Sequence, residues 1–362
     1  MDKQEILVLS KLNVSTKKYS QLCNLAAGRT FFETIVSGGE TVREMFGAAL
    51  FSKLKIALSP QNVEKTVEEL NKLHIKYILC TDSDYPQVFK EVEDFPLVIY
   101  YLGDKSLLKS DIITIAGSRK PTSYGIEVAE RFSKELSGGG LVVMSGIAYG
   151  IDTVVAKATL DEKGKFIAFV AGGLDSIYPE ENTELARNIV RGGGLIISTY
   201  PPYKASLKFS FLERNRYETL LSRGTVIIEA SKKSGTFATA NFTIENGREL
   251  FVVPGNIYSP KSEGSNLLIE TYPEVFTISA AKIFMKLGIK YELKQKSAPS
   301  KALDSDEVLI LGAVACEEKS LDEIAELTKI ESKILLRKLT IMEINGLIKK
   351  LPGNFYVGIK QD

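Results

Sequence analysis

The chain has 362 residues, of which 44% are hydrophobic and 25% charged, a balance typical of a globular protein with two or three domains. Its 46 basic and 45 acidic side chains give a formal net charge of +1, so a nucleic-acid site would have to be a local cluster of positive charge. A single histidine and three scattered cysteines argue against Ser-His or Cys-His catalysis, a metal site and a disulfide framework.

The apolar residues also indicate where the protein works. No apolar run is long enough to cross a membrane, and the first residues lack the apolar core of a signal peptide. We therefore expect a cytoplasmic protein with no membrane partner.

Residues 1–72 are predicted to form a small helical N-terminal domain. Apolar side chains recur at three- and four-residue spacing in the segments 3–12, 18–27, 41–55 and 62–73. The next segment, 75–104, contains two strand-like runs around an acidic loop with prolines.

The middle of the chain, 73–290, is predicted to be an extended Rossmann-like α/β domain. Val/Ile/Leu-rich strands are expected within 112–117, 141–146, 166–173, 195–199, 225–231 and 250–255. Helical patterns separate them, and this alternation is typical of a doubly wound, mostly parallel sheet. The two GGG runs, at 138–140 and 192–194, are interpreted as helix C-caps.

The last part of the chain is predicted to be a linker, 291–306, and a winged helix, 307–362. Three helical patterns precede a hairpin with Pro-Gly-Asn at its turn. The third helix is expected to carry the basic residues Lys329, Lys333, Arg337 and Lys338. Two roles remain open for this domain, namely duplex DNA binding and contact with a protein.

The carboxyl ends of the predicted strands are where a ligand should bind in such a sheet. Six segments at these ends are small or basic, beginning with GSRKPTSYG at 117–125. Exposed backbone amides there suit phosphates. The chain has no GxxxxGK[ST] and no GxGxxG after the first sheet strand, and the nearby carboxylates show no metal-ligand pairing, so neither a nucleotide cofactor nor a metal is predicted.

An ordered set of motifs resembles the DNA-processing protein A (DprA/Smf) family. The set is GSRKPTSYG, SGIAYGID, YPEEN, YPP, RNR, SGTFATA, NGRELFVVPG and GSNLLI. The resemblance implies a protein that is not an enzyme, that binds single-stranded DNA entering the cell in natural transformation, and that helps load a RecA-type recombinase. It also implies a homodimer formed through the Rossmann-like domain.

Carried onto this chain, the resemblance and the strand ends together give one set of expected DNA contacts. They are Gly117, Ser118, Arg119, Lys120, Ser145, Gly146, Phe211, Arg214, Asn215, Arg216, Ser234, Gly235, Thr236 and Asn266. Arginines would hold phosphates, and Phe211 would offer a ring for base stacking.

The chain departs from the family pattern at several positions. Tyr149 stands where the family has arginine, and Lys157 where it has histidine. Tyr149 either weakens a phosphate contact or offers a stacking ring, and the sequence leaves both open.

A nucleotide-binding enzyme of the nucleoside-monophosphate phosphoribohydrolase type is the alternative. Such enzymes resemble this chain in pairing an early GSR with a later SGT. However, their PGGxGTxxE motif places a glutamate just after the threonine, and the stretch here, KKSGTFATAN, has none.

Overall fold

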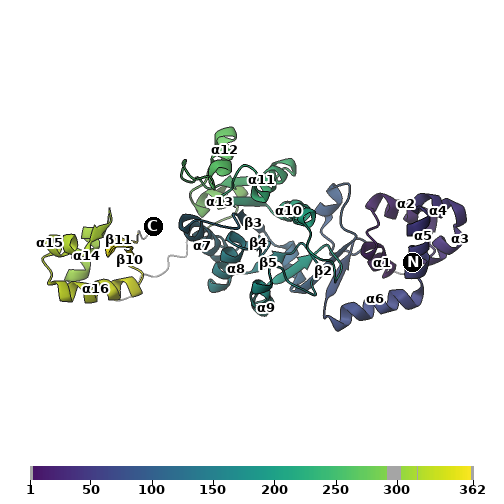
Figure 1. Ribbon diagram of the computed structural model, residues 1–362, viewed down its shortest axis with the longest axis horizontal. Helices are drawn as coiled ribbons and strands as arrows, with labels where there is room; N and C mark the ends of the chain where they lie inside the picture. The colour runs from purple at the N-terminus through teal and green to yellow at the C-terminus, as the bar shows by residue number, and fades with distance from the viewer. Residues whose placement is uncertain (1–2, 292–302, 316, 360–362) are drawn as a thin grey trace. The chain divides into compact units, whose positions relative to one another are not determined.

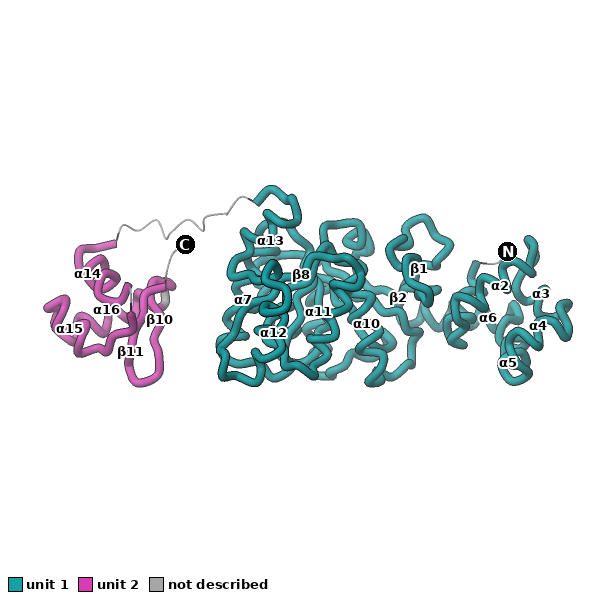
Figure 2. Tube along the Cα trace, turned by 90° about the horizontal axis from the view of Figure 1, so that it is seen from above, with its two compact units in different colours: residues 1–293 teal, residues 294–362 magenta. Residues whose placement is uncertain are grey.

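A computed structural model describes residues 3–291, 303–315 and 317–359. The helices and strands given below all lie within these ranges. The chain divides into two compact units, residues 1–293 and 294–362 (Figure 2). Most of the predicted linker, 292–302, lies outside the described residues.

The large unit is built on a mixed sheet with strand order β1-β2-β6-β5-β4-β3-β7-β8 (Figure 1). Its strands are β1 (Lys76–Leu79), β2 (Val98–Gly103), β3 (Ile112–Gly117), β4 (Val142–Ser145), β5 (Phe166–Phe169), β6 (Leu195–Ser198), β7 (Gly224–Ile228) and β8 (Glu249–Val252). The six strands from β3 to β8 run parallel, whereas β1 and β2 join antiparallel beside β6. The predicted doubly wound, mostly parallel sheet is confirmed.

Helices follow the parallel strands as the alternation predicts. They are α7 (Ser123–Gly138), α8 (Ile151–Asp161), α9 (Thr183–Arg191), α10 (Lys208–Leu221), α11 (Gly235–Glu245), α12 (Glu263–Thr271) and α13 (Ala280–Leu287). Both GGG runs end helices, since Gly139 caps α7, Gly192 caps α9, and the next glycine in each run has a positive φ. The parallel strands are buried throughout, apart from the ends of β3 and β8.

The N-terminal part is helical, as predicted, but its helices are shorter and more numerous. They are α1 (Glu5–Lys11), α2 (Thr16–Ala26), α3 (Phe31–Ser37), α4 (Gly39–Phe46), α5 (Ala48–Ala57) and α6 (Pro60–Lys72). The single helix expected over 41–55 is two helices, because Gly47 separates them with a φ of 77°. One continuous core joins these helices to the sheet, and Thr16 Oγ1 donates to the Glu93 carbonyl at 2.6 Å.

The C-terminal unit is the predicted winged helix. It contains α14 (Ser305–Val314), β9 (Lys319–Ser320), α15 (Leu321–Thr328), α16 (Ser332–Ile344), β10 (Ile348–Leu351) and β11 (Phe355–Gly358). Helix α14 begins two residues before the predicted start of the winged helix at 307, because the Asp304 carboxylate accepts from the Asp306 and Glu307 amides and starts the helix. Lys329 caps α15 rather than lying on α16, and Lys338 is paired with Asp304 and Asp306.

Nowhere in the described ranges is a helix both long and apolar enough to cross a bilayer.

Candidate functional site

A pocket of about 700 Å³ opens at the carboxyl ends of β3, β4 and β7. Strand β3 lies at the centre of the sheet order, with β4 on one side and β7 on the other. The strand order reverses here, since β4, β5 and β6 lie on one side of β3 and β7 and β8 on the other, and open α/β sheets bind ligands at such a switch point. The pocket therefore lies where the strand pattern predicts a ligand to bind.

Ten of the predicted contact residues line this pocket. They are Gly117, Ser118, Arg119, Ser145, Phe211, Arg214, Asn215, Ser234, Gly235 and Thr236. The remaining four, Lys120, Gly146, Arg216 and Asn266, are not among its lining residues.

Two lysines in the pocket wall were not anticipated from the sequence. Lys208 opens helix α10, and Lys261 precedes α12. With Arg119 and Lys233 they give four cations, and none of these four has an ion-pair partner among the residues that the structure describes. Lys208 could have been predicted from the sequence, since it lies three residues before Phe211. The first turn of a helix that follows a strand end faces this crevice.

The GSR turn is held rigidly beneath the pocket. A Cβ on Gly117 would lie 2.3 Å from the Ile228 carbonyl oxygen, so only glycine fits there. The Gly117 carbonyl accepts from Thr236 Oγ1 at 2.9 Å, and the Ser118 carbonyl accepts from the Ile151 amide at 3.1 Å. These contacts tie the turn to α8 and α11, so that Arg119 projects from a fixed backbone.

The start of α11 supplies backbone donors at the pocket. Ser234 caps the helix, accepting from the Phe237 amide at 3.1 Å and donating to the Ser231 carbonyl at 2.8 Å. Its hydroxyl is therefore committed to the helix cap. The first amides of a helix have no intrahelical acceptor, so Gly235 and Thr236 offer N–H groups of the kind that bind phosphate.

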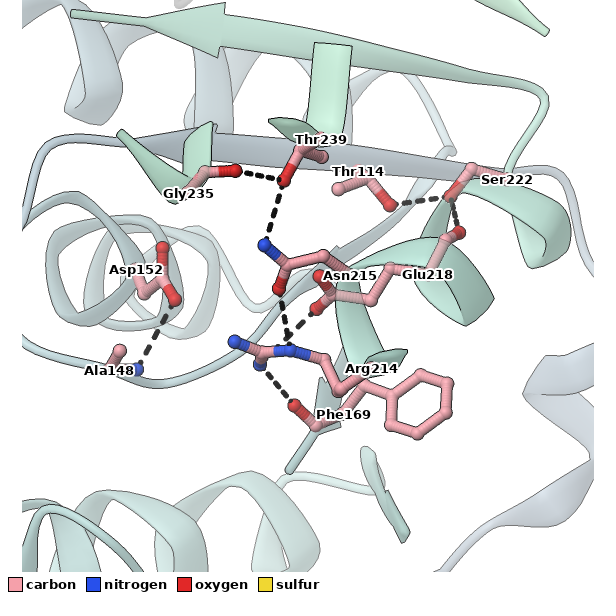
Figure 3. Close-up of polar contacts among 10 residues, drawn as sticks. All are labelled: Thr114, Ala148, Asp152, Phe169, Arg214, Asn215, Glu218, Ser222, Gly235 and Thr239. Carbon is pink, nitrogen blue, oxygen red and sulfur yellow. Dashed lines mark hydrogen bonds and ion pairs between the residues drawn. The ribbon is translucent and has the colours of Figure 1, made fainter. Parts of the chain in front are cut away.

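Arg214 lies in the pocket wall, but its guanidinium is buried rather than free. Its Nη1 donates to the Phe169 carbonyl at 2.5 Å, and its Nε donates to Asn215 Oδ1 at 3.0 Å (Figure 3). The same Nη1 lies 3.5 Å from Glu218 Oε1, and the two side chains are 5% and 4% exposed. Arg214 thus holds β5 and α10 together, in contrast to the free phosphate-binding cation that the RNR motif led us to expect.

Gly146 supports this buried arginine instead of touching the pocket. A Cβ at Gly146 would lie 1.7 Å from Arg214 Nη1, so the guanidinium packs directly against the glycine backbone. Asn215 completes the arrangement, because its Nδ2 donates to Thr239 Oγ1 at 2.9 Å (Figure 3). The network therefore spans α10, α11 and the end of β5.

Buried carboxylates accompany Arg214. Burial raises the pKa of Glu218 to about 8, although the Arg214 charge opposes the rise and Asp152 adds to it. Burial also raises the pKa of Asp152, against the charges of Arg214 and Arg119. Across the described ranges, no three His, Cys, Asp or Glu side chains gather in a way that could hold a metal ion.

Arg119 and Phe211 form the exposed side of the site. The Arg119 Cζ lies 4.9 Å from the centroid of the Phe211 ring, and the Arg214 Cζ lies 5.9 Å from it. Both distances are within the range of cation–π attraction. Phe211 is only partly buried, and Arg119 is exposed.

The four predicted residues outside the pocket have other surroundings. Lys120 is exposed beside the turn, and Arg216 is exposed on α10. Asn266 holds the loop after β8, because its amide side chain accepts from the Gly255 N–H and donates to the Gly255 carbonyl, both at 3.1 Å. Gly146 packs against Arg214, as described above.

The family models decide which proteins this chain is related to. A model described as DNA recombination-mediator protein A matches residues 76–288, and a model of the DprA winged helix domain matches residues 294–354. The chain belongs to the DprA family.

Individual DprA relatives agree with this assignment. DNA processing protein DprA of Bacillus subtilis (strain 168) is 34% identical over 243 residues, which cover 65% of this chain and 81% of the relative. Protein Smf of Escherichia coli (strain K12) is 30% identical over 291 residues, covering 77% of this chain and 76% of the relative.

Solved DprA structures share the fold. DNA processing protein A from Streptococcus pneumoniae superposes with a TM-score of 0.67 at 27% identity, covering 81% of this chain and 99% of that chain. The DNA processing protein A from Helicobacter pylori, whose structure concerns its single-stranded DNA binding mode, gives a TM-score of 0.54 at 30% identity. That match covers 61% of this chain and 99% of the Helicobacter chain.

Proposed function

We propose that this DprA family member binds single-stranded DNA in the pocket and helps load a RecA-type recombinase onto the strand, in natural transformation and recombination. The observation that carries the binding proposal is a set of four cations around one pocket, Arg119, Lys208, Lys233 and Lys261, which have no ion-pair partner within the described ranges. Cations placed in this way bind a phosphate backbone whatever its sequence. Family membership supports the recombinase step, since the family model describes a recombination mediator.

The carboxylates in the pocket contact groups other than these four cations. Glu229 accepts from the Thr122 amide at 2.9 Å and from the Thr122 hydroxyl, and so holds the N-cap residue of α7. Glu218 is paired with Arg214, and Asp152 accepts from the Ala148 amide at 3.3 Å. Among the described residues, none of these carboxylates forms an ion pair with Arg119, Lys208, Lys233 or Lys261, so the four cations can pair with an anionic ligand.

The proposal predicts salt-sensitive binding that favours single strands over duplex. If all four cations contact phosphates, the log–log salt slope should be about −3, because each contact to a single strand contributes roughly 0.7. Titration of single- and double-stranded oligonucleotides at two salt concentrations measures both quantities. Equal affinity for the two forms, or a slope near zero, would contradict the proposal, as would turnover of nucleoside monophosphates.

The same titration on a shortened chain of residues 1–293 measures how much the winged helix contributes to binding single-stranded and duplex DNA. Helix α16 exposes Lys333 and Arg337, but it also exposes Ile334, Leu336 and Ile341. Cations there suit duplex DNA, whereas exposed aliphatic side chains suit a protein partner. Loss of duplex affinity alone in the shortened chain would assign the duplex to the winged helix.

We further propose that the chain forms a homodimer through exposed apolar side chains near strand β8. Phe276 pairs with Val252 at the end of β8 and is 37% exposed. Ile278, two residues before α13, is 61% exposed, and Met285, on α13, is 71% exposed. Such side chains beside a sheet edge are typical of a protein contact.

The double substitution Ile278→Asp, Met285→Asp should convert a dimer into a monomer, because it places charges in the contact. Sedimentation velocity measures the change. Ile56→Asp is the matched control, since Ile56 is 69% exposed on α5, far along the chain from α13. A mass that is unchanged by the double substitution would place the dimer contact elsewhere.

A further inference from the structure

An exposed row of aromatic rings leads away from the phosphate pocket. The Phe211 ring in the pocket wall meets the Tyr178 ring at 5.9 Å between centroids, with the planes at 65°. Tyr178 in turn meets Tyr149 at 6.3 Å, with the planes at 81°. The three rings come from helix α10 and from the loops after β5 and β4, so the fold brings them together from distant parts of the sequence.

The two outer rings remain accessible although they are fixed in place. Tyr149 is 43% exposed and Tyr178 is 52% exposed. Edge-to-face contacts restrain both rings, and the Tyr149 hydroxyl also donates to Glu181 Oε2 at 2.8 Å. Accessible rings that are already ordered lose little conformational entropy when a flat ligand stacks on them.

The charges along the row indicate which part of a nucleic acid would lie on it. Arg119 and Lys208 are at the Phe211 end, in the pocket wall. The far end carries the Glu181 carboxylate, which repels phosphate and accepts hydrogen bonds from base amino groups. A strand whose phosphates lie in the pocket would therefore turn its bases, and not its backbone, toward Tyr178 and Tyr149.

We propose that Tyr178 and Tyr149 form a second subsite, in which nucleobases of the strand stack beyond the phosphate pocket. The subsite rests on the proposed single-strand binding and adds to it a defined path for the bases. Tyr149 then acts as a stacking ring at the position where the family pattern has arginine. The neighbouring nucleotides are held by ring contacts rather than by charge, so this part of the binding should be insensitive to salt.

A tryptophan at position 178 tests the subsite directly, because the chain has no tryptophan of its own. In the full-length Tyr178→Trp chain, oligo-dT should quench the fluorescence of this one tryptophan by stacking. Oligo-dT probes that each carry one abasic position, with every phosphate kept, should include one that binds without quenching. The proposed subsite would be contradicted if oligo-dT did not quench the fluorescence. It would also be contradicted if all the abasic probes quenched the fluorescence equally.

Affinities give a second and independent readout. Tyr149→Ala and Tyr178→Ala should each weaken oligo-dT binding about 5- to 150-fold, which corresponds to about 1–3 kcal/mol per stacked base. The salt slope should not change. Tyr149→Phe is the matched control, because it keeps the ring and removes only the hydrogen bond to Glu181.

The two levels of the proposal fail in different ways. Unchanged affinity in both alanine variants, with normal binding by the unaltered chain, would overturn the subsite and leave the phosphate pocket intact. No binding of oligo-dT by the unaltered chain would overturn the proposed function and the subsite with it. Circular dichroism melting of each variant shows whether its fold is preserved.

Discussion

Arg119→Ala should weaken single-stranded DNA binding about 10- to 150-fold, in line with the ~1.5–3 kcal/mol of a hydrogen bond to a charged group. Arg119 is exposed, lines the pocket and projects from a backbone that Gly117 and Thr236 hold in place. The log–log salt slope should become less steep by about 0.7, because one phosphate contact is lost. Fluorescence anisotropy of a labelled oligonucleotide over a range of salt concentrations measures both changes.

Lys120→Ala is the matched control for this experiment. Lys120 is the next residue, carries the same charge and is also exposed, but it does not line the pocket. Its removal should leave the affinity and the slope almost unchanged. Equal effects of the two substitutions would show that the binding depends on the general charge of the turn and not on the pocket.

Arg214→Ala should act mainly on the stability of the fold. Removing one partner of a buried ion pair costs up to about 3–5 kcal/mol when the other group stays charged. The cost is smaller here, because Glu218, with a pKa of about 8, can take up a proton and become neutral. Here the Glu218 carboxylate would be left, and the Phe169 carbonyl would lose a donor. Urea denaturation followed by circular dichroism measures the free energy of unfolding.

The pH dependence of this stability has a definite sign. The pKa of Glu218 rises from its ordinary 4.5 to about 8 in the folded chain, so the folded state holds a proton that the unfolded state has released. The contribution of Glu218 to the free energy of unfolding should therefore fall as the pH rises from about 4.5 to about 8. Arg214→Ala removes the charge that opposes the shift, so this fall should become larger.

A second substitution separates the two roles of Arg214. Adding Glu218→Gln to Arg214→Ala replaces the buried carboxylate by a neutral amide, and it should restore part of the stability and remove this pH dependence. Arg216→Ala, an exposed arginine on the same helix, should change the free energy of unfolding by no more than about 0.5 kcal/mol. An Arg214→Ala chain of normal stability that no longer binds DNA would show instead that Arg214 is a phosphate contact.

Local sequence patterns were enough to predict most of the fold. The Val/Ile/Leu runs gave the six parallel strands, because strands buried on both faces carry almost no polar residues. The two GGG runs marked helix ends for a different local reason, because glycine readily adopts the positive φ that follows a helix end. The N-terminal part was less predictable, since the apolar spacing continues through Gly47 although the backbone there leaves the helix. Its continuous core with the sheet depends on contacts between residues far apart in the chain.

The location of the pocket could also be predicted from the sequence, because residues after parallel strands meet at one edge of the sheet whatever their side chains are. Whether each side chain is exposed, buried or paired could not be predicted from the sequence. Arg119 and Arg214 both lie within 6 Å of the Phe211 ring, yet one is exposed and the other is buried against Gly146 and Glu218. Burial and pairing depend on neighbours brought from other strands and helices, so only the tertiary structure decided which arginine is free to bind and which three rings stand in a row.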